Sequence, residues 1–231
     1  MYLSKLTLNL RDRNARRALG DCHMLHTTLM RAFPSLEEPN PRAAIGLLYR
    51  VEPSRAARVC ILAQSIKEPN WADLPAWCVE NETKPVVALY DRIVAGQTLT
   101  FRLRANPTKI AGERPEGGQL MNAHRKALRD PVKQMEWLIR AGERGGFDPV
   151  FVHVARRAVD GAVIGTVDVP DVRIVPEPDV RGDSHRTLGS VRFEGRLTVR
   201  DAALFRRTLA DGVGRGKAYG FGLLSVAPAR L

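Results

Sequence analysis

Apolar and polar residues alternate in several short segments of the chain, and this period of two is typical of half-buried β-strands. The pattern predicts strands in the segments 2–10, 45–52, 58–66, 84–93, 97–107, 149–159, 189–199 and 219–228. Residues Pro53-Ser54-Arg55 form the expected turn between the second and third of these strands. The Pro- and Asp-rich segment 168–185 lies between two of these strands, 149–159 and 189–199.

Three segments have the apolar spacing of helices. Residues 19–33 form the first, with Asp21 as N-cap and Pro34 as the stop. The second covers 130–147, where Asp130 caps, Pro131 lies in the first turn and Gly145-Gly146 end the helix. The third is residues 201–213, and the segment 70–81 is expected to be a short helix or irregular.

The order β-α-β-β-(α)-β therefore occurs twice along the chain, and it is the split βαβ order of a ferredoxin-like fold. The prediction is an α+β protein with two tandem ferredoxin-like βαββαβ domains, residues 1–94 and 97–231. In the strand 97–107, Leu99, Phe101 and Leu103 share one face, while Arg102 and Arg104 share the other. We expect Phe101, Phe193 and the helical Trp137 to face the core and not to stack on bases.

The charge adds a functional class to this picture. A net charge of +11 indicates a polyanionic partner, with nucleic acid ahead of a membrane surface, although a solvated basic surface without a partner is the alternative. Residues 101–231 hold 23 Lys and Arg against 15 Asp and Glu, so this half should carry most of the contacts, among them Arg102, Arg104 and Lys109.

Composition also bears on compartment. The three cysteines are widely spaced and lack a CxxC pair, which favours reduced thiols in a cytoplasmic protein. No apolar run has transmembrane length, and the first residues have the pattern of a strand, so we expect neither a membrane segment nor a signal peptide.

A glycine-rich segment, Asp211 to Ser225, resembles a nucleotide-binding loop only at first sight. A P-loop would need glycine at Asp211 and Ser or Thr at Ala218, and no GxGxxG register fits the glycines. Two interpretations stay open. The backbone can approach a phosphodiester closely, with Arg215 and Lys217 supplying charge, or the segment is a tight helix-to-strand connection that needs positive φ.

Two of the five histidines, His23 and His26, lie three residues apart on the predicted first helix. They could be a catalytic pair, packing residues or, with Cys22, part of a zinc site. The zinc site is disfavoured because Cys22 and His23 are adjacent and point different ways on a helix, and because the sequence has no companion cluster of ligands. His124, His153 and His185 have no motif around them and are expected to be surface or core residues.

Several motifs, in order along the whole chain, resemble those of the CasE-type CRISPR RNA-processing endoribonucleases, the type I-E branch of the RAMP superfamily. The motifs are "MYLSKL", "MLHTTLMRAFP", "LTFRLRANPTK", "VRFEGRLTV" and "GVGRGKAYGFGLLSVAP". The resemblance implies tandem ferredoxin-like domains that cut precursor CRISPR RNA at the base of the repeat hairpin without metal or cofactor. It also implies that the protein keeps the mature crRNA and joins other Cascade subunits.

The resemblance assigns the family's catalytic histidine to His26. His23 lies where relatives often carry an aromatic residue, so packing, RNA contact and catalysis all stay open for it. Without a metal, the adjacent 2′-OH attacks the phosphate, and a histidine can serve as base or acid. In the glycine-rich segment, Gly216 would let the backbone lie against RNA, with Lys217 near the scissile phosphate or lower stem and Arg215 on a neighbouring phosphate.

Two other functions remain as alternatives. One is a RAMP-fold subunit that binds RNA without cutting it, which would have no need of His26. The other is an unrelated basic protein that regulates messenger RNA.

Overall fold

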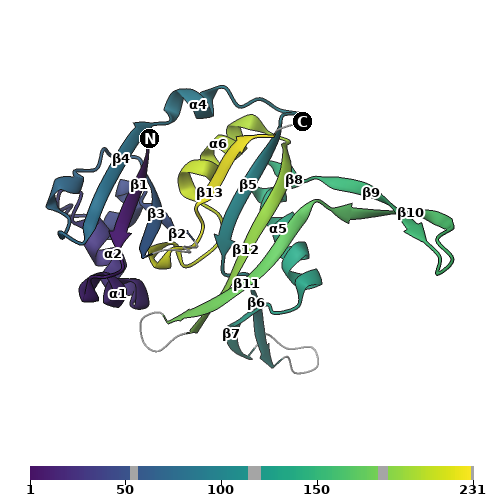
Figure 1. The fold of residues 1–231 in the computed structure, drawn as a ribbon, viewed down its shortest axis with the longest axis horizontal. Coiled ribbons are helices and arrows are strands. Elements are labelled where there is room, and N and C mark those ends of the chain that lie inside the picture. The colour runs from purple at the N-terminus through teal and green to yellow at the C-terminus, as the bar shows by residue number, and fades with distance from the viewer. Residues whose placement is uncertain (53–56, 114–120, 182–186, 230–231) are drawn as a thin grey trace.

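The protein was analysed as a computed structural model that describes residues 1–52, 57–113, 121–181 and 187–229. The predicted turn at 53–55 and the prediction for His185 lie outside these residues. Figure 1 shows two sheet-containing halves side by side, with the chain entering the second half through α4 (Val87–Asp91).

The first half is an antiparallel sheet in the order β2-β3-β1-β4. Its strands are β1 (Tyr2–Asn9), β2 (Leu48–Val51), β3 (Arg58–Ser65) and β4 (Cys78–Pro85). The connection from β1 to β2 contains α1 (Arg13–Gly20), α2 (Cys22–Met30) and α3 (Pro41–Ile45), and the 3₁₀ turn η1 (Trp71–Asp73) lies between β3 and β4. Leu6, Leu8 and Ile61 from the sheet and Leu25 and Leu29 from α2 share one core.

The second half has a main sheet in the order β11-β12-β5-β13, with β8 also paired to β12. Its strands are β5 (Thr98–Ala105), β8 (Phe147–Pro149), β11 (Val172–Arg181), β12 (Thr187–Val199) and β13 (Leu224–Pro228), and its helices are α5 (Pro131–Gly145) and α6 (Ala202–Asp211). Phe101, Phe193 and Trp137 are buried in its core, as predicted.

Both sheets follow one topology. In each, the first strand of the repeat lies between the third and the fourth, and the second strand lies outside the third, so β1-β2-β3-β4 corresponds to β5-β11-β12-β13. This is the ferredoxin-like order, and the prediction of two such folds in tandem is confirmed. The predicted division at 94–97 falls in the segment between α4 and β5.

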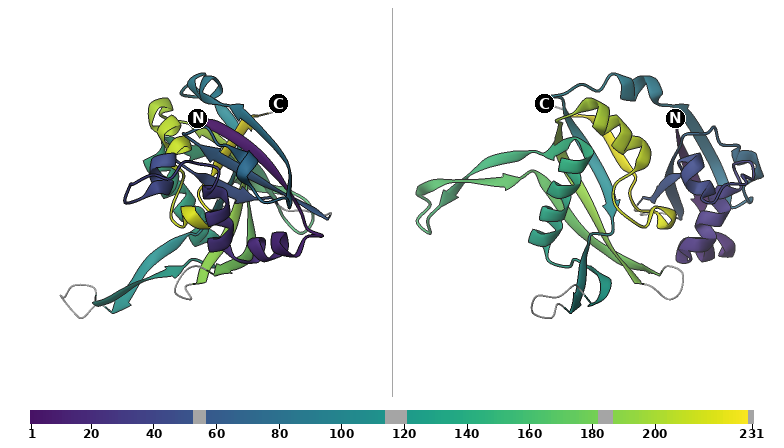
Figure 2. Two further views of the ribbon diagram at one scale, coloured as in Figure 1. Left: turned by 90° about the vertical axis from the view of Figure 1, so that its left-hand side faces the viewer. Right: turned by 180° about the vertical axis from the view of Figure 1, so that it is seen from behind.

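Two hairpins project from the second half, one teal in the left view of Figure 2 and one green in its right view. One is β6 (Thr108–Glu113) with β7 (Met121–Ala127), and the other is β9 (Phe151–Arg157) with β10 (Val163–Pro170). The segment 149–159 contains a strand, β9, as predicted, but β9 pairs with β10, and β11 is the second strand of the repeat in the main sheet.

The Pro- and Asp-rich segment 168–185 contains the end of β10 and the edge strand β11. An edge strand tolerates proline because one row of its N–H groups is not needed for pairing, and β11 holds both Pro176 and Pro178.

The prediction of a strand at 84–93 is also wrong, because the strand β4 ends at Pro85 and α4 follows. The edge strand β4 pairs on one side only, with β1, and most of its side chains are exposed. The polar composition of β4 therefore lacks the apolar alternation that predicts a strand. The apolar residues after Pro85 form a helical turn instead, in which the Tyr90 N–H donates to the Val86 carbonyl.

The helix predicted at 19–33 is in fact two helices that meet at Asp21. Asp12 caps α1, and Asp21 caps α2 as predicted, but α2 ends at Met30 and not at Pro34. The helix α5 has the predicted Asp130 cap and Pro131 in its first turn, and it ends at Gly145-Gly146. None of the helices in the described part of the chain is long and apolar enough to cross a membrane.

Candidate active site and RNA-binding surface

His26 lies in the middle of α2, the helix that covers the first sheet. The Asp21 carboxylate starts this helix by accepting hydrogen bonds of 3.0 Å from the backbone N–H groups of His23 and Met24. Leu25 and Leu29 bury one face of the helix in the core. His26 is therefore half-buried at the boundary of that core, on a helix whose position is fixed by packing and capping.

The His26 imidazole stacks on the ring of Tyr49 from β2, with 6.5 Å between the ring centroids and 16° between the planes. Tyr49 is only 1% exposed. Its hydroxyl donates to the Ala218 carbonyl at 2.9 Å, and the Cys22 carbonyl lies 3.4 Å away. Burial raises the pKa of Tyr49 well above its ordinary value, so this hydroxyl is a hydrogen-bond donor and not a base.

Ala218 belongs to the glycine-rich segment, whose 3₁₀ turn η3 (Lys217–Tyr219) packs against α2. The structure thus brings the predicted residues His26 and Lys217 to the same side of the molecule. Lys217 is half-buried. Burial lowers the pKa of Lys217, the charge of Arg42 lowers it further, and Asp211 partly offsets both.

The five glycines of this segment all have positive φ, between 76° and 89°. A Cβ on Gly216 would lie 2.9 Å from the Phe221 ring, and one on Gly212 would lie 2.8 Å from the Leu48 side chain. The chain's own packing therefore accounts for these glycines, which supports the interpretation as a tight helix-to-strand connection. The closeness of Gly216 to RNA stays a prediction.

His23 is exposed in the first turn of α2, three residues before His26. Cys22, beside it, donates its thiol to the Arg181 carbonyl at 2.7 Å. Among the residues that the structure describes, no group of three or more His, Cys, Asp and Glu side chains is placed to hold a metal ion. His124 and His153 are on the surface, within the range expected for them.

A cavity of about 520 Å³ opens beside this arrangement. It is bounded by α1 and α2 on one side, by the end of β11 on another and by Tyr49, Arg104 and Tyr219 between them. Aromatic rings next to cationic and backbone polar groups are what an unstacked nucleotide can bind. The Tyr49 ring, on which the His26 imidazole stacks, is thus part of a concave surface.

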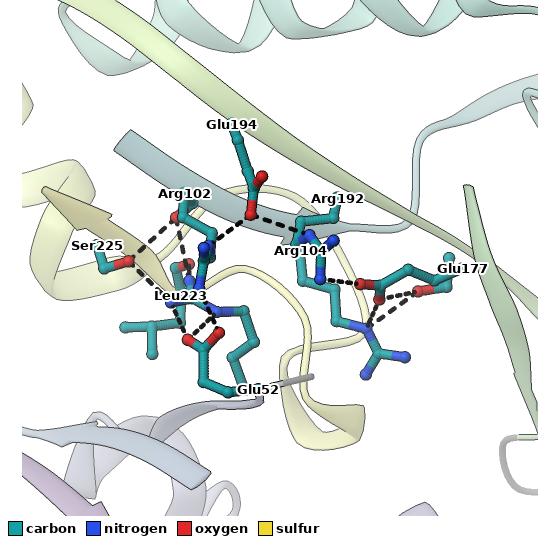
Figure 3. A network of polar contacts seen from close by, with 10 residues as sticks. Glu52, Arg102, Arg104, Glu177, Arg192, Glu194, Leu223 and Ser225 are labelled. Atoms are coloured by element: carbon teal, nitrogen blue, oxygen red, sulfur yellow. Dashed lines mark hydrogen bonds and ion pairs between the residues drawn. The ribbon is translucent and has the colours of Figure 1, made fainter. Parts of the chain in front are cut away.

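Arg102 does not line this cavity, but Arg104 does, and its guanidinium carbon lies 5.0 Å from the centroid of the Phe221 ring in the glycine-rich segment. Figure 3 shows both arginines in a network of ion pairs. Arg102 contacts Glu52 at 2.6 Å and Glu194 at 2.7 Å, and Arg104 contacts Glu177 at 2.7 Å. These carboxylates already neutralise both guanidinium groups, so a phosphate would have to compete with them.

The same network joins the two halves of the chain. Arg50, on β2, is buried and donates to the backbone carbonyls of Arg102 at 3.0 Å and Leu223 at 3.1 Å. It also donates to Glu52 at 2.8 Å and to the Ser225 hydroxyl at 2.9 Å. The pattern of apolar and polar residues does not indicate this role, because Arg50 lies among apolar residues in the short strand β2.

Lys109 and Arg215, by contrast, come together in a second cavity of about 580 Å³. We call this cavity the basic pocket, defined by Lys109, Arg125, Arg140, Arg144 and Arg215. None of its lining residues is acidic. Of these five, the sequence analysis missed Arg125, Arg140 and Arg144, although the spacing of four between Arg140 and Arg144 could have placed them on one helix face.

The glycine-rich segment links the two regions. Arg215 lines the basic pocket, and Lys217, two residues later, lies in the turn that packs on α2. Two residues of extended chain span at most about 7 Å. A polyanion bound in the basic pocket thus lies within reach of the segment that contacts the histidine helix.

Comparison with known proteins identifies the family. Residues 1–228 match the model of a family described as CRISPR associated protein. The chain is 36% identical to the CRISPR-associated endoribonuclease Cse3 of Thermus thermophilus over 99% of its length and 100% of that protein. It is 29% identical to the CRISPR system Cascade subunit CasE of Escherichia coli, again over 99% and 100% of the two chains.

A solved structure agrees with these matches. Thermus thermophilus Cse3, bound to an RNA that represents a pre-cleavage complex, superposes with a TM-score of 0.77 and 34% identity over 98% of both chains. The matches cover both halves of the chain, including α2, the basic pocket and the glycine-rich segment. This protein belongs to the CRISPR-associated family that contains the endoribonuclease Cse3 and the Cascade subunit CasE.

Proposed function

We propose that the protein is the endoribonuclease that processes precursor CRISPR RNA, and that it cuts at the base of the repeat hairpin. The observation that carries the proposal is the packing of the His26 helix against the Lys217–Tyr219 turn in a chain 36% identical, over 99% of its length, to a CRISPR-associated endoribonuclease. The basic pocket supplies an adjacent surface for RNA phosphates.

The reaction uses the 2′-OH next to the scissile phosphate. Its oxygen bonds to phosphorus while the bond to the 5′-oxygen breaks, which leaves a 2′,3′-cyclic phosphate and a 5′-OH. One group must accept the 2′-OH proton and another must supply a proton to the 5′-oxygen, and His26 fills one of these roles. The charge of Lys217 stabilises the phosphorane, and its lowered pKa also suits it to proton donation. No step requires a metal or cofactor.

His23 is the second candidate at this site. It lies on the same helix, three residues from His26, and is exposed to a ligand. We assign it to RNA contact or proton transfer with the same phosphate.

RNA binding and assembly complete the proposal. Lys109, Arg215 and the other cations of the basic pocket bind the hairpin. Arg102 and Arg104 support the RNA-binding half of the chain through their ion pairs. The protein keeps the mature crRNA and joins other Cascade subunits, as the name of the Escherichia coli relative indicates for that protein. Cys22, Cys60 and Cys78 form no disulfide, in keeping with a cytoplasmic location.

The experiment is incubation with hairpin RNAs of candidate repeats in EDTA. We expect a single cut, a cyclic phosphate end and no cleavage when the nucleotide before the cut is 2′-deoxy. His26→Ala should lose about two to four decades of single-turnover rate while still binding the hairpin, since that is typical of removing one proton-transfer group. His153→Ala, an exposed histidine on β9, is the matched control and should cut normally.

The alternative is a RAMP-fold subunit that holds RNA without cutting it. Binding without cleavage of every repeat hairpin by the parent protein would favour this alternative. Cleavage of the 2′-deoxy substrate would contradict the 2′-OH mechanism, and full activity of His26→Ala would contradict the assignment of the histidine. Membership of the family leaves an unrelated regulator of messenger RNA without support.

A further inference from the structure

Tyr49 is a buried phenol that contacts both elements of the proposed active site. Its ring lies under the His26 imidazole on α2, and its hydroxyl donates to the Ala218 carbonyl in the glycine-rich segment. The second contact joins residues far apart in the chain, with a separation of 169 between Tyr49 and Ala218. One side chain thus joins a helix of the first half to a turn of the second.

The position of the Tyr49 ring is itself fixed. Tyr49 lies on β2, where its neighbours Leu48 and Arg50 are also buried, and β2 pairs with β3. Across the ring, Gly220 approaches so closely that a Cβ there would lie 3.1 Å from Tyr49 Cε2. Gly220 has a φ of 80°, which a residue with a side chain rarely adopts, so the turn is built to pass close to the ring.

Tyr49 does not touch the reacting atoms in the way that a catalytic residue does. It is 1% exposed and covered by the imidazole and the turn, so RNA cannot reach its hydroxyl. Its effect must therefore act through the groups it holds. The flat ring restricts the tilt of the imidazole, and the hydroxyl holds Ala218 and, next to it, Lys217 at a fixed height over α2.

We propose that Tyr49 is a positioning residue for RNA cleavage, holding the His26 imidazole and the Lys217 segment in register through its ring and its hydroxyl. The inference rests on the proposed function of His26. A misplacement of about 1 Å can cost roughly a hundredfold in rate, so loss of the hydroxyl should affect the rate of the chemical step more than RNA affinity.

The test is a double-mutant cycle of Tyr49→Phe and Lys217→Ala, measured as single-turnover cleavage of a repeat hairpin with protein in excess. Tyr49→Phe keeps the ring and removes only the hydroxyl; we expect about tenfold slower cleavage, a shifted pH–rate profile and a Kd for the 2′-deoxy hairpin within about twofold of the parent. In the Lys217→Ala background, the same substitution should leave the residual rate unchanged, because the hydroxyl then has no lysine to position.

Tyr90→Phe is the matched control. It also removes a largely buried hydroxyl, but one that donates to Gln64 at 3.0 Å, on β3 and not on α2 or the glycine-rich segment. Tyr90→Phe should cleave at the parent rate. Tyr49→Leu, which removes ring and hydroxyl, should be slower than Tyr49→Phe, and this second variant keeps the test decisive if the first effect is small.

The outcomes separate the two proposals. A slow His26→Ala variant with a parent-like Tyr49→Phe and a parent-like Tyr49→Leu overturns the positioning role and leaves the proposed function intact. Equal losses from Tyr49→Phe with and without Lys217 also overturn it, since they reveal general damage to the fold. A fully active His26→Ala protein refutes the proposed function instead.

Discussion

At the scale of single residues, the environment of Lys217 lowers the pKa of its ammonium group. Its ordinary pKa is 10.5, and burial and Arg42 lower it in the folded protein. Between the lowered value and 10.5 the unfolded chain binds more protons than the folded one, so this lysine makes stability rise with pH in that window. A bound phosphate has the opposite preference, because it favours the protonated form.

The prediction concerns RNA affinity at alkaline pH. As pH rises through the lowered pKa, Lys217 loses its charge and the affinity of the parent for the 2′-deoxy hairpin should fall. Lys217→Arg stays charged over the same range, so its affinity should be less dependent on pH. Binding titrations between pH 7 and pH 10 at constant salt measure the difference. Identical pH dependence in both proteins would show that the Lys217 charge does not face RNA.

At the scale of elements, the basic pocket gives the clearest expectation for binding. Arg140 and Arg144 come from α5, Lys109 and Arg125 from the β6–β7 hairpin, and Arg215 from the glycine-rich segment. Each cation that contacts a phosphate contributes about one unit to the slope of log affinity against log salt.

We therefore expect Arg140→Ala and Arg144→Ala each to weaken hairpin binding and to reduce that slope by about one unit. Arg207→Ala, an exposed arginine on α6, is the matched control and should leave the slope unchanged. Affinities measured from about 50 to 200 mM salt separate these cases. An unchanged slope in both α5 variants would exclude the basic pocket as the phosphate surface.

The glycine-rich segment allows a matched comparison of stability. Gly216 and Gly96 both have positive φ, but a Cβ on Gly216 would meet Phe221 at 2.9 Å, whereas nothing lies within 4 Å of one on Gly96. Gly216→Ala should therefore lower the free energy of unfolding by about 1–3 kcal/mol more than Gly96→Ala, the usual range for overpacking. Denaturant unfolding measures the difference. Equal losses, combined with weaker RNA binding in Gly216→Ala alone, would favour a glycine that faces RNA.

These elements also show what could be predicted from sequence. Regular alternation and helix caps located β1, β5, β12, α5 and α6, because local chemistry determines them. The strands β4 and β11 were not predicted, because edge strands need neither an apolar face nor a full set of N–H donors. The partners of Arg102 and Arg104 are far away in sequence, with 50 residues between Arg102 and Glu52, so strand periodicity gave their face but not their ion pairs.

At the scale of the whole molecule, the network around Arg50 is the main polar connection between the two halves. Glu52 accepts from Arg50 and from Arg102, and its side chain is 17% exposed. Removing one partner of a largely buried ion pair leaves the other charge uncompensated, which typically costs about 3–5 kcal/mol. A second connection runs from Gln64, on β3, to the Leu209 carbonyl in α6 at 2.6 Å.

Glu52→Gln should therefore lower the melting temperature strongly and broaden the transition as the halves separate. Glu80→Gln is the matched control, since Glu80 pairs with Arg58 in an ion pair whose two side chains are both 60% exposed. Exposed pairs contribute little, so this control should melt like the parent. Calorimetry of the two variants makes the comparison, and a parent-like Glu52→Gln protein would contradict the role of the network.

The contact between Tyr49 and Ala218 has a consequence for the time at which the enzyme becomes active during its synthesis. The ribosome makes the histidine helix early, but the Ala218 carbonyl, which binds the hydroxyl of Tyr49, is made 169 residues after Tyr49. Contacts between residues so far apart form late and slowly in folding. A nascent chain can thus carry a folded first half while its site is still open. If Tyr49 positions His26 and Lys217 as proposed, ribonuclease activity is expected only after the glycine-rich segment has been translated.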